Sequence, residues 1–276
     1  MDSTLKILHP DKDRYLSLEE LKYYYIDGYY KIIGAKETEK LTHFLKCYED
    51  FTKNDKNRIT DENVYSDLPF SIQTDTWKER QKDINIIDAL IKSKNELEIL
   101  DIGSWNGWLP NYYTKKGHNV IAINMFTDEF NGLTAHKKYQ TRYISLQLMT
   151  HEIYRIQHKF DVIIFNRNWA YFQNHQNVFN DAKKLLSKNG IIVFTGLPFY
   201  KNPNNIITSL VNVNRKYKNK YDIDLLYKPS KGYLEFKDKL FFKENNIQLF
   251  TYHKIKSLIK KGLPKKVILQ YGLFYK

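Results

Sequence analysis

The chain has 276 residues, 42% of them hydrophobic, which is enough to bury the core of one large domain or of a domain with an appendage. A mean hydropathy of −0.59 and the lack of any apolar run near the ~18–20 residues of a membrane helix exclude a membrane-spanning protein. Cys47 is the only cysteine, which excludes an intrachain disulfide and a cysteine metal cluster, and we predict no metal site.

The net charge of +13 is typical of a protein that binds nucleic acid or another anionic surface. Only seven of the 44 basic residues are arginine, however, and arginine is the residue whose planar fork recognises phosphate best. A lysine excess is equally explained by an AT-rich gene. The first residues show no basic-then-apolar signal pattern, and we expect a cytoplasmic protein.

Residues 1–95 are predicted to form an N-terminal helical cap. Ser17 followed by Glu20 is typical of a capping box, and the apolar and aromatic positions after it predict a helix that continues to about residue 32. The same periodicity predicts helices over 39–51 and 76–93, with a polar loop after the first of these.

From residue 97 onward, strand and helix patterns alternate, which predicts an α/β fold with a doubly wound parallel sheet over 96–276. The segment 198–232 is long for a crossover and is predicted to be a lid insert. The expected strands are 98–102, 119–124, 141–146, 160–166, 190–195, 247–252 and 267–274, and the expected helices are 107–116, 132–138, 178–187 and 234–245.

The first of these strands leads into a glycine turn, Asp101-Ile-Gly-Ser-Trp-Asn-Gly107, and then into a helix start. Glycines let a ligand approach the backbone, and free N–H groups at a helix N-terminus face it. The turn resembles motif I of the class I S-adenosylmethionine (SAM) dependent methyltransferases, D/E-x-G-x-G-x-G. The resemblance covers about residues 76–276, and the runs around it are similar to a bacterial subgroup of methyltransferase type 11/12.

This resemblance implies a Rossmann-like seven-stranded sheet with an antiparallel final strand, SAM as the cofactor, and a set of cofactor-binding residues at the turn. That set is Asp101, Gly103, Ser104, Asn106 and Gly107. Trp105 stands where the family has its middle glycine. Its indole must either turn outward, which we favour, or occupy part of the pocket.

Three further cofactor-binding residues are implied by their positions at strand ends. Asn124 replaces the acid that binds the ribose hydroxyls, Gln147 lies where the family often places an acid against the adenine amine, and Asn166 ends the fourth strand. An amide offers one acceptor and one donor, so these replacements predict weaker binding. Together with Trp105 they leave open a weakened or lost cofactor site.

The segment after the fourth strand is expected to face the transferred methyl group, because ligands of open α/β sheets lie beyond the carboxyl ends of the strands. Tyr171, whose phenol can donate and accept, and Arg167, which could pair with an anionic group, are the candidate catalytic residues. We therefore predict a SAM-dependent methyltransferase with a small-molecule acceptor. The alternatives are a catalytically inactive relative that serves as a binding or scaffolding subunit, and an RNA methyltransferase.

Overall fold

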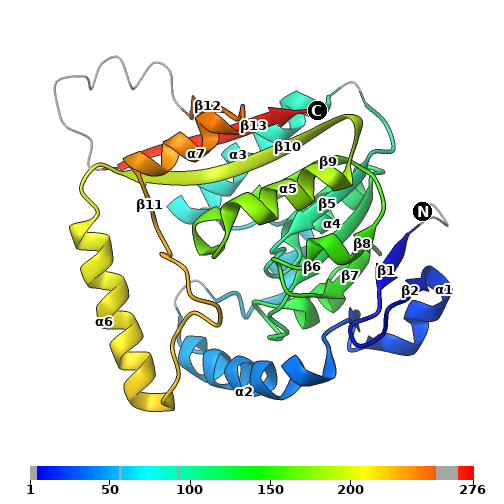
Figure 1. Cartoon of the computed structure of the whole chain (residues 1–276), viewed down its shortest axis with the longest axis horizontal. Coiled ribbons are helices and arrows are strands. Elements are labelled where there is room, and N and C mark those ends of the chain that lie inside the picture. Colours follow the sequence, from blue (N-terminus) through cyan, green and yellow to red (C-terminus); the bar gives the residue numbers. More distant parts are fainter. Residues whose placement is uncertain (1–4, 56–57, 93, 253–266) are drawn as a thin grey trace.

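A computed structural model describes residues 5–55, 58–92, 94–252 and 267–276 (Figure 1). Its centre is a seven-stranded run in which five strands are parallel to one another and β13 lies antiparallel to both of its neighbours. The predicted α/β fold is thereby confirmed, including the antiparallel final strand. The expected count of seven strands is too low, because three further short strands join the sheet, which has ten strands within the described residues. In spatial order the run is β7 (Ile144–Gln147), β6 (Asn119–Asn124), β5 (Glu98–Ile102), β9 (Phe160–Asn166), β10 (Leu186–Tyr200), β13 (Val267–Tyr275) and β12 (Gln248–Thr251).

The central strands are apolar on both sides because helices cover both faces of the sheet. Alternate residues of β5 divide between the two halves of the core: Ile99 packs in one cluster and Leu100 in the other. The first cluster includes side chains of α3 (Asp75–Ile91) and α4 (Trp108–Lys115), and the second includes those of α5 (His175–Leu185) and α7 (Lys239–Glu244).

The predicted helix from Ser17 to residue 32 is wrong beyond its first turns. The capping box of Ser17 and Glu20 is present, but the helix α1 covers only Leu18–Leu21 and a 3₁₀ turn, η1 (Lys22–Tyr24), follows it. The chain then forms a hairpin of β3 (Tyr25–Ile26) and β4 (Tyr29–Lys31), turning at Asp27 and Gly28, which both have positive φ. Aspartate-glycine is a strong hairpin signal, and here it overrides the helical periodicity of the tyrosines.

The hairpin also ties the N-terminal segment to the main sheet, because β4 pairs in parallel with β7. A separate three-stranded sheet is made of β1 (Lys6–Leu8), β2 (Tyr15–Ser17) and β8 (Ile156–Gln157). Residues 1–95 are thus helical only in part, chiefly in α2 (Ala35–Thr52) and α3, where helices were expected. The domain boundary near residue 95 stays a prediction.

Several short elements differ from the predicted ones in type or extent. The helix expected over 234–245 is a strand β11 (Leu234–Glu235), a 3₁₀ turn η6 (Phe236–Asp238) and then α7, and the strand expected from 141 begins at Ile144. The helix expected over 132–138 is the 3₁₀ helix η3 (Leu133–Lys138). The remaining 3₁₀ turns are η2 (Glu62–Asp67), η4 (Ile153–Arg155) and η5 (Trp169–Tyr171).

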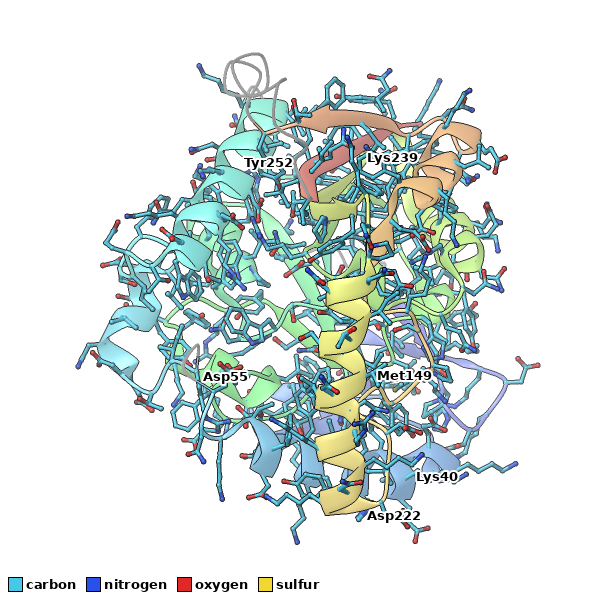
Figure 2. All side chains as sticks on the ribbon, turned by 90° about the vertical axis from the view of Figure 1, so that its left-hand side faces the viewer. Lys40, Asp55, Met149, Asp222, Lys239 and Tyr252 are labelled. Carbon is cyan, nitrogen blue, oxygen red and sulfur yellow. The ribbon has the colours of Figure 1, made fainter. Side chains whose placement is uncertain are left out.

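The predicted lid contains one long helix, α6 (Asn204–Tyr221), which stands apart from the sheet and reaches α2 (Figures 1 and 2). The expected start of the insert at 198 is three residues early, because β10 continues to Tyr200. Tyr217, fully buried, packs edge-on against Phe51 of α2, while Tyr221 donates a 2.6 Å hydrogen bond to Asp50. The helix therefore forms a wall together with α2, and its role as a lid stays a prediction.

Within the described residues, no helix is long and apolar enough to cross a membrane. The same residues contain no group of three or more histidine, cysteine, aspartate or glutamate side chains suited to hold a metal ion.

The packing of α6 against α2 can be tested by substitution of Tyr217. Tyr217→Ala removes a buried ring and should lower the free energy of unfolding by about 3 kcal/mol or more. Tyr217→Phe should change it little, because the Tyr217 hydroxyl has no hydrogen-bond partner in the described structure. Urea unfolding of both variants measures the difference, and equal stabilities would show that α6 does not pack on α2.

Candidate functional site

The turn after β5 is built from alternating left-handed residues. Gly103, Trp105 and Gly107 have φ values of 75°, 49° and 82°, and Gly107 is the N-cap of α4. The backbone N–H groups of Gly103 and Ser104 both donate to the Ile123 carbonyl, at 2.8 and 3.0 Å. These two bonds hold the turn against the end of β6. The turn lies at the switch in strand order beside β5, which is where ligands of open α/β sheets bind.

The two glycines of the turn lie so close to other side chains that there is no room for a Cβ atom at either position. A Cβ at Gly103 would collide with the amide of Asn168, which itself donates to the Ile102 carbonyl. A Cβ at Gly107 would collide with the hydroxyl of Tyr143 and the ring of His136. These contacts, together with the positive φ values, explain why glycine is retained at two of the three motif positions.

Trp105 packs against helix α3. Its indole stacks on that of Trp77, with ring centroids 5.6 Å apart and planes inclined by 24°, and the Arg80 guanidinium lies 4.8 Å from the centre of the Trp105 ring. The indole is half-buried in this position. The backbone carbonyl of Trp105 contacts a different element, the end of β6, where it accepts a 3.2 Å hydrogen bond from the side chain of Asn124.

Asp101, the penultimate residue of β5, has an almost completely buried carboxyl and is 1% exposed. Burial raises its pKa to about 8, so that it is protonated at neutral pH. Within the described residues its Oδ1 has no hydrogen-bond partner, and the same holds for a group of buried polar atoms at the end of β7 and on the loops that follow β5 and β9. They are Ser104 Oγ, Asn106 Nδ2, Gln147 Oε1 and Asn168 Oδ1.

The amides at the ends of β6 and β7 are partly engaged. Asn124 donates to the Trp105 carbonyl and accepts a 3.3 Å hydrogen bond from the N–H of Phe126, while Gln147 donates to the Met125 carbonyl at 3.3 Å. Gln147 also lines a cavity of about 280 Å³ beneath α2, together with residues that include Tyr48 and Phe126. Register pairs Asn124 with Gln147, so both side chains stand at the same level of the sheet edge.

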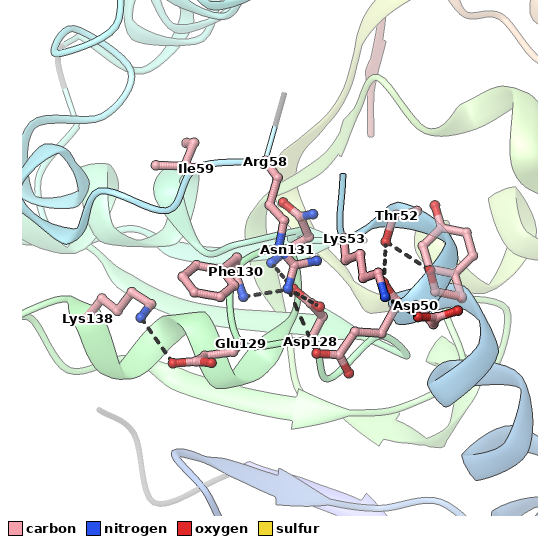
Figure 3. A network of polar contacts seen from close by, with 12 residues as sticks. Asp50, Thr52, Lys53, Arg58, Ile59, Asp128, Glu129, Phe130, Asn131 and Lys138 are labelled. Carbon is pink, nitrogen blue, oxygen red and sulfur yellow. Dashed lines mark hydrogen bonds and ion pairs between the residues drawn. The ribbon is translucent and has the colours of Figure 1, made fainter. Parts of the chain in front are cut away.

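The loop after β6 that borders this cavity is fixed by ionic contacts (Figure 3). Arg58 and Asp128 form an ion pair at 2.9 Å in which both side chains are 8% exposed. Asp128 also accepts hydrogen bonds from the backbone N–H groups of Phe130 and Asn131, at 2.7 and 2.6 Å. The cavity wall is thus held rigidly from two directions.

Asn166 and Arg167, at the end of β9, belong to a buried network centred on Asp83 of α3. Arg167 Nε donates to Asp83 at 2.6 Å and Nη1 donates to Glu79 at 2.8 Å, while Asn166 donates to Asp83 at 3.2 Å. Burial alone would lower the pKa of Arg167, but the charge and hydrogen bonds of Asp83 raise it above its ordinary value. Arg167 is therefore committed to carboxylates of the protein itself.

The network extends to the far strands of the sheet. Tyr252 donates to Asp83 at 2.5 Å and accepts a hydrogen bond from the N–H of Gly196 at 2.7 Å. Figure 2 shows Tyr252 beside α3. Tyr171, the other candidate catalytic residue, lies apart from this network in η5, with 54% of its side chain exposed.

The structure therefore brings Asp101, Gly103, Asn124, Gln147 and Asn166 to one edge of the sheet, and their role as cofactor-binding residues stays a prediction. Sequence reasoning missed Asp83, Arg80 and Asn168 as members of this region. Asp83 carried a usable signal, because it is a carboxylate on the apolar face of α3 beside Ile84 and Ile87, where burial requires a charged partner.

Comparisons with known proteins agree with this architecture. Residues 100–194 match the family model described as a methyltransferase domain. A crystal structure of the plantazolicin methyltransferase BpumL with a pentazolic desmethylPZN analogue and S-adenosylhomocysteine (SAH) matches 87% of this chain and 98% of its own chain, at 18% identity and a TM-score of 0.50. Phosphoethanolamine N-methyltransferase 2 of Haemonchus contortus matches over 83% of this chain and 60% of its own, at 11% identity and a TM-score of 0.48.

No curated protein sequence matches the chain significantly. The family model and the sheet order nonetheless agree: residues 100–194 match the methyltransferase-domain model, and the chain has the fold of the class I SAM-dependent methyltransferases. The resemblance drawn from the turn after β5 is thereby confirmed.

The buried carboxyl of Asp101 predicts a pH effect with a defined sign. In the unfolded chain Asp101 ionises above about pH 4, whereas the folded protein holds the proton up to about pH 8. Folding therefore takes up a proton between these values, and the stability that Asp101 contributes is complete below pH 4 and declines as the pH rises to 8.

Asp101→Asn, which is neutral at every pH, should remove this decline. As the pH rises from 5 to 8, the free energy of unfolding of this variant should increase relative to that of the wild type by up to about 1.4 kcal/mol per pH unit. Urea unfolding at several pH values measures the gain. Parallel curves for the two proteins would mean that Asp101 is ionised when folded.

Proposed function

We propose that the chain is a SAM-dependent methyltransferase that acts on a small-molecule acceptor. The observation that carries this proposal is the group of buried polar atoms without partners around the turn after β5, on Asp101, Ser104, Asn106, Gln147 and Asn168. Buried polar groups are normally hydrogen-bonded, so a group of them at one edge of the sheet favours a polar ligand. That edge is where ligands of open α/β sheets bind.

The chemistry of these atoms fits SAM. Gln147 offers a carbonyl oxygen, the acceptor that the 6-amino group of adenine requires, and it lines the cavity beside Phe126. Asn168 offers a second carbonyl oxygen, suited to the ammonium of the amino-acid end, and Asn106 an N–H donor. Asn124 retains a second lone pair on Oδ1 for a ribose hydroxyl.

When bound, SAM supplies an electrophilic methyl group on its sulfonium sulfur. The chain's own contribution is then chiefly positioning, because methyl transfer is an in-line displacement. Tyr171 is exposed in η5, the 3₁₀ turn that follows β9, and its hydroxyl can donate a hydrogen bond to a methyl acceptor or accept one from it. Arg167 positions α3 against β9 through Asp83, and its charge is already paired.

A single substitution tests the adenine contact. Gln147→Met keeps the length of the side chain but removes the acceptor, and it should weaken SAH binding about tenfold by calorimetry. The matched probe is S-inosylhomocysteine, which has an oxygen in place of the adenine amine. Its affinity should be lower for the wild type and unchanged by Gln147→Met.

Two results would contradict the proposal. If neither SAM nor SAH binds the folded wild type at millimolar concentration, the chain is a methyltransferase relative without the cofactor. If SAH binds but Gln147→Met weakens both ligands equally, Gln147 supports the loop and does not contact adenine.

A further inference from the structure

Arg80 is a cation held against two indoles of the candidate site. It projects from α3, and its guanidinium lies 5.0 Å from the ring centre of Trp77 and 4.8 Å from that of Trp105. The two indoles are themselves stacked. Arginine over a tryptophan face is attracted by the ring quadrupole, so these contacts fix the direction of the side chain without using its N–H donors.

The donors of Arg80 are largely unused within the described residues. Its one hydrogen bond runs from Nη1 to the Thr76 carbonyl at 3.0 Å, and its buried Nε has no partner. Glu79 and Asp83, the acids nearest to it on α3, are both paired with Arg167. Burial lowers the pKa of Arg80 to about 10, and the neighbouring charge of Arg167 acts in the same direction.

Arg80 also stands at the switch in strand order. Trp105 follows β5 and Arg167 follows β9, and these two strands are neighbours in the sheet although helices and strands separate them in the chain. A ligand beyond the carboxyl ends of β5 and β9 would therefore lie next to the guanidinium of Arg80.

We propose that Arg80 binds a carboxylate in this site, with Trp77 and Trp105 as the platform that orients its guanidinium. The charges of Arg80 and Arg167 balance those of Glu79 and Asp83. With no net positive charge at the site, a singly charged carboxylate is accommodated more easily than a doubly charged phosphate. An arginine fork matches the two oxygens of a carboxylate. Trp105, which stands where the family has a glycine, then contributes to the carboxylate site by holding the Arg80 guanidinium in place.

The proposal rests on the proposed SAM-dependent function, because the carboxylate has two sources: the amino-acid end of the cofactor or an acidic acceptor. The first arm of the test compares SAH with 5′-methylthioadenosine, which lacks the amino-acid end, by calorimetry on the wild type and Arg80→Gln. The second arm titrates benzoate into the free and the SAH-loaded protein and follows tryptophan fluorescence, to which Trp77 and Trp105 contribute.

If the cofactor supplies the carboxylate, Arg80→Gln should weaken SAH binding by about tenfold to a hundredfold and leave methylthioadenosine unaffected. If the acceptor supplies it, SAH affinity stays the same and benzoate quenching of the SAH-loaded protein is lost in Arg80→Gln. Arg80→Lys, which keeps the charge but not the fork, should retain part of either effect. Arg215→Gln, an exposed change on α6, is the matched control.

The proposal is overturned if Arg80→Gln folds with the wild-type urea midpoint and changes neither SAH nor benzoate binding. Failure of the proposed function has a different signature: no adenosine ligand binds the wild type. In that case benzoate binding to the free wild type, lost in Arg80→Gln, still supports the carboxylate site, and its absence overturns the site as well.

Discussion

The left-handed backbone at Trp105 is the constraint on which the rest of the site depends. A bulky residue at φ 49° is strained by about 1–3 kcal/mol, and glycine would avoid this cost. Stacking on Trp77 contributes about 0.5–1.5 kcal/mol and the Arg80 contact a similar amount. The two contacts together offset the strain, which explains how the turn keeps its shape without its middle glycine.

The position of α3 determines whether these contacts exist. Asp83 fastens the helix to the end of β9 through Arg167 and Asn166, and to the far side of the sheet through Tyr252. One buried carboxylate thus places Trp77 and Arg80 over the turn. The N-terminal region, which joins the sheet through β4, is accordingly part of the site's construction as well as of its wall.

The sequence predicts what depends on local pattern. The bounds of β5, β6 and β9 agree with the expected strands, because these buried strands are continuous apolar runs ended by turn residues. The aspartate-glycine hairpin at residues 27–28 was overlooked in favour of a helical period. The Asp83 network and the stack on Trp105 could not be predicted from spacing. Their members come from α3, from the turn after β5, from the end of β9 and from the residue after β12, and these parts meet only in the folded chain. Two buried polar atoms without partners among the described residues lie at predicted positions: Asp101 belongs to the motif, and Gln147 was indicated by its place at a strand end.

The most direct test of the account is calorimetric titration of SAH into the wild type and into Trp105→Gly. Because the indole packs on α3 and supports Arg80, the account predicts that the wild type binds SAH at one site per chain and that Trp105→Gly binds no more tightly. Binding that appears only after Trp105→Gly would contradict the account, since it would show that Trp105 closes the cofactor site.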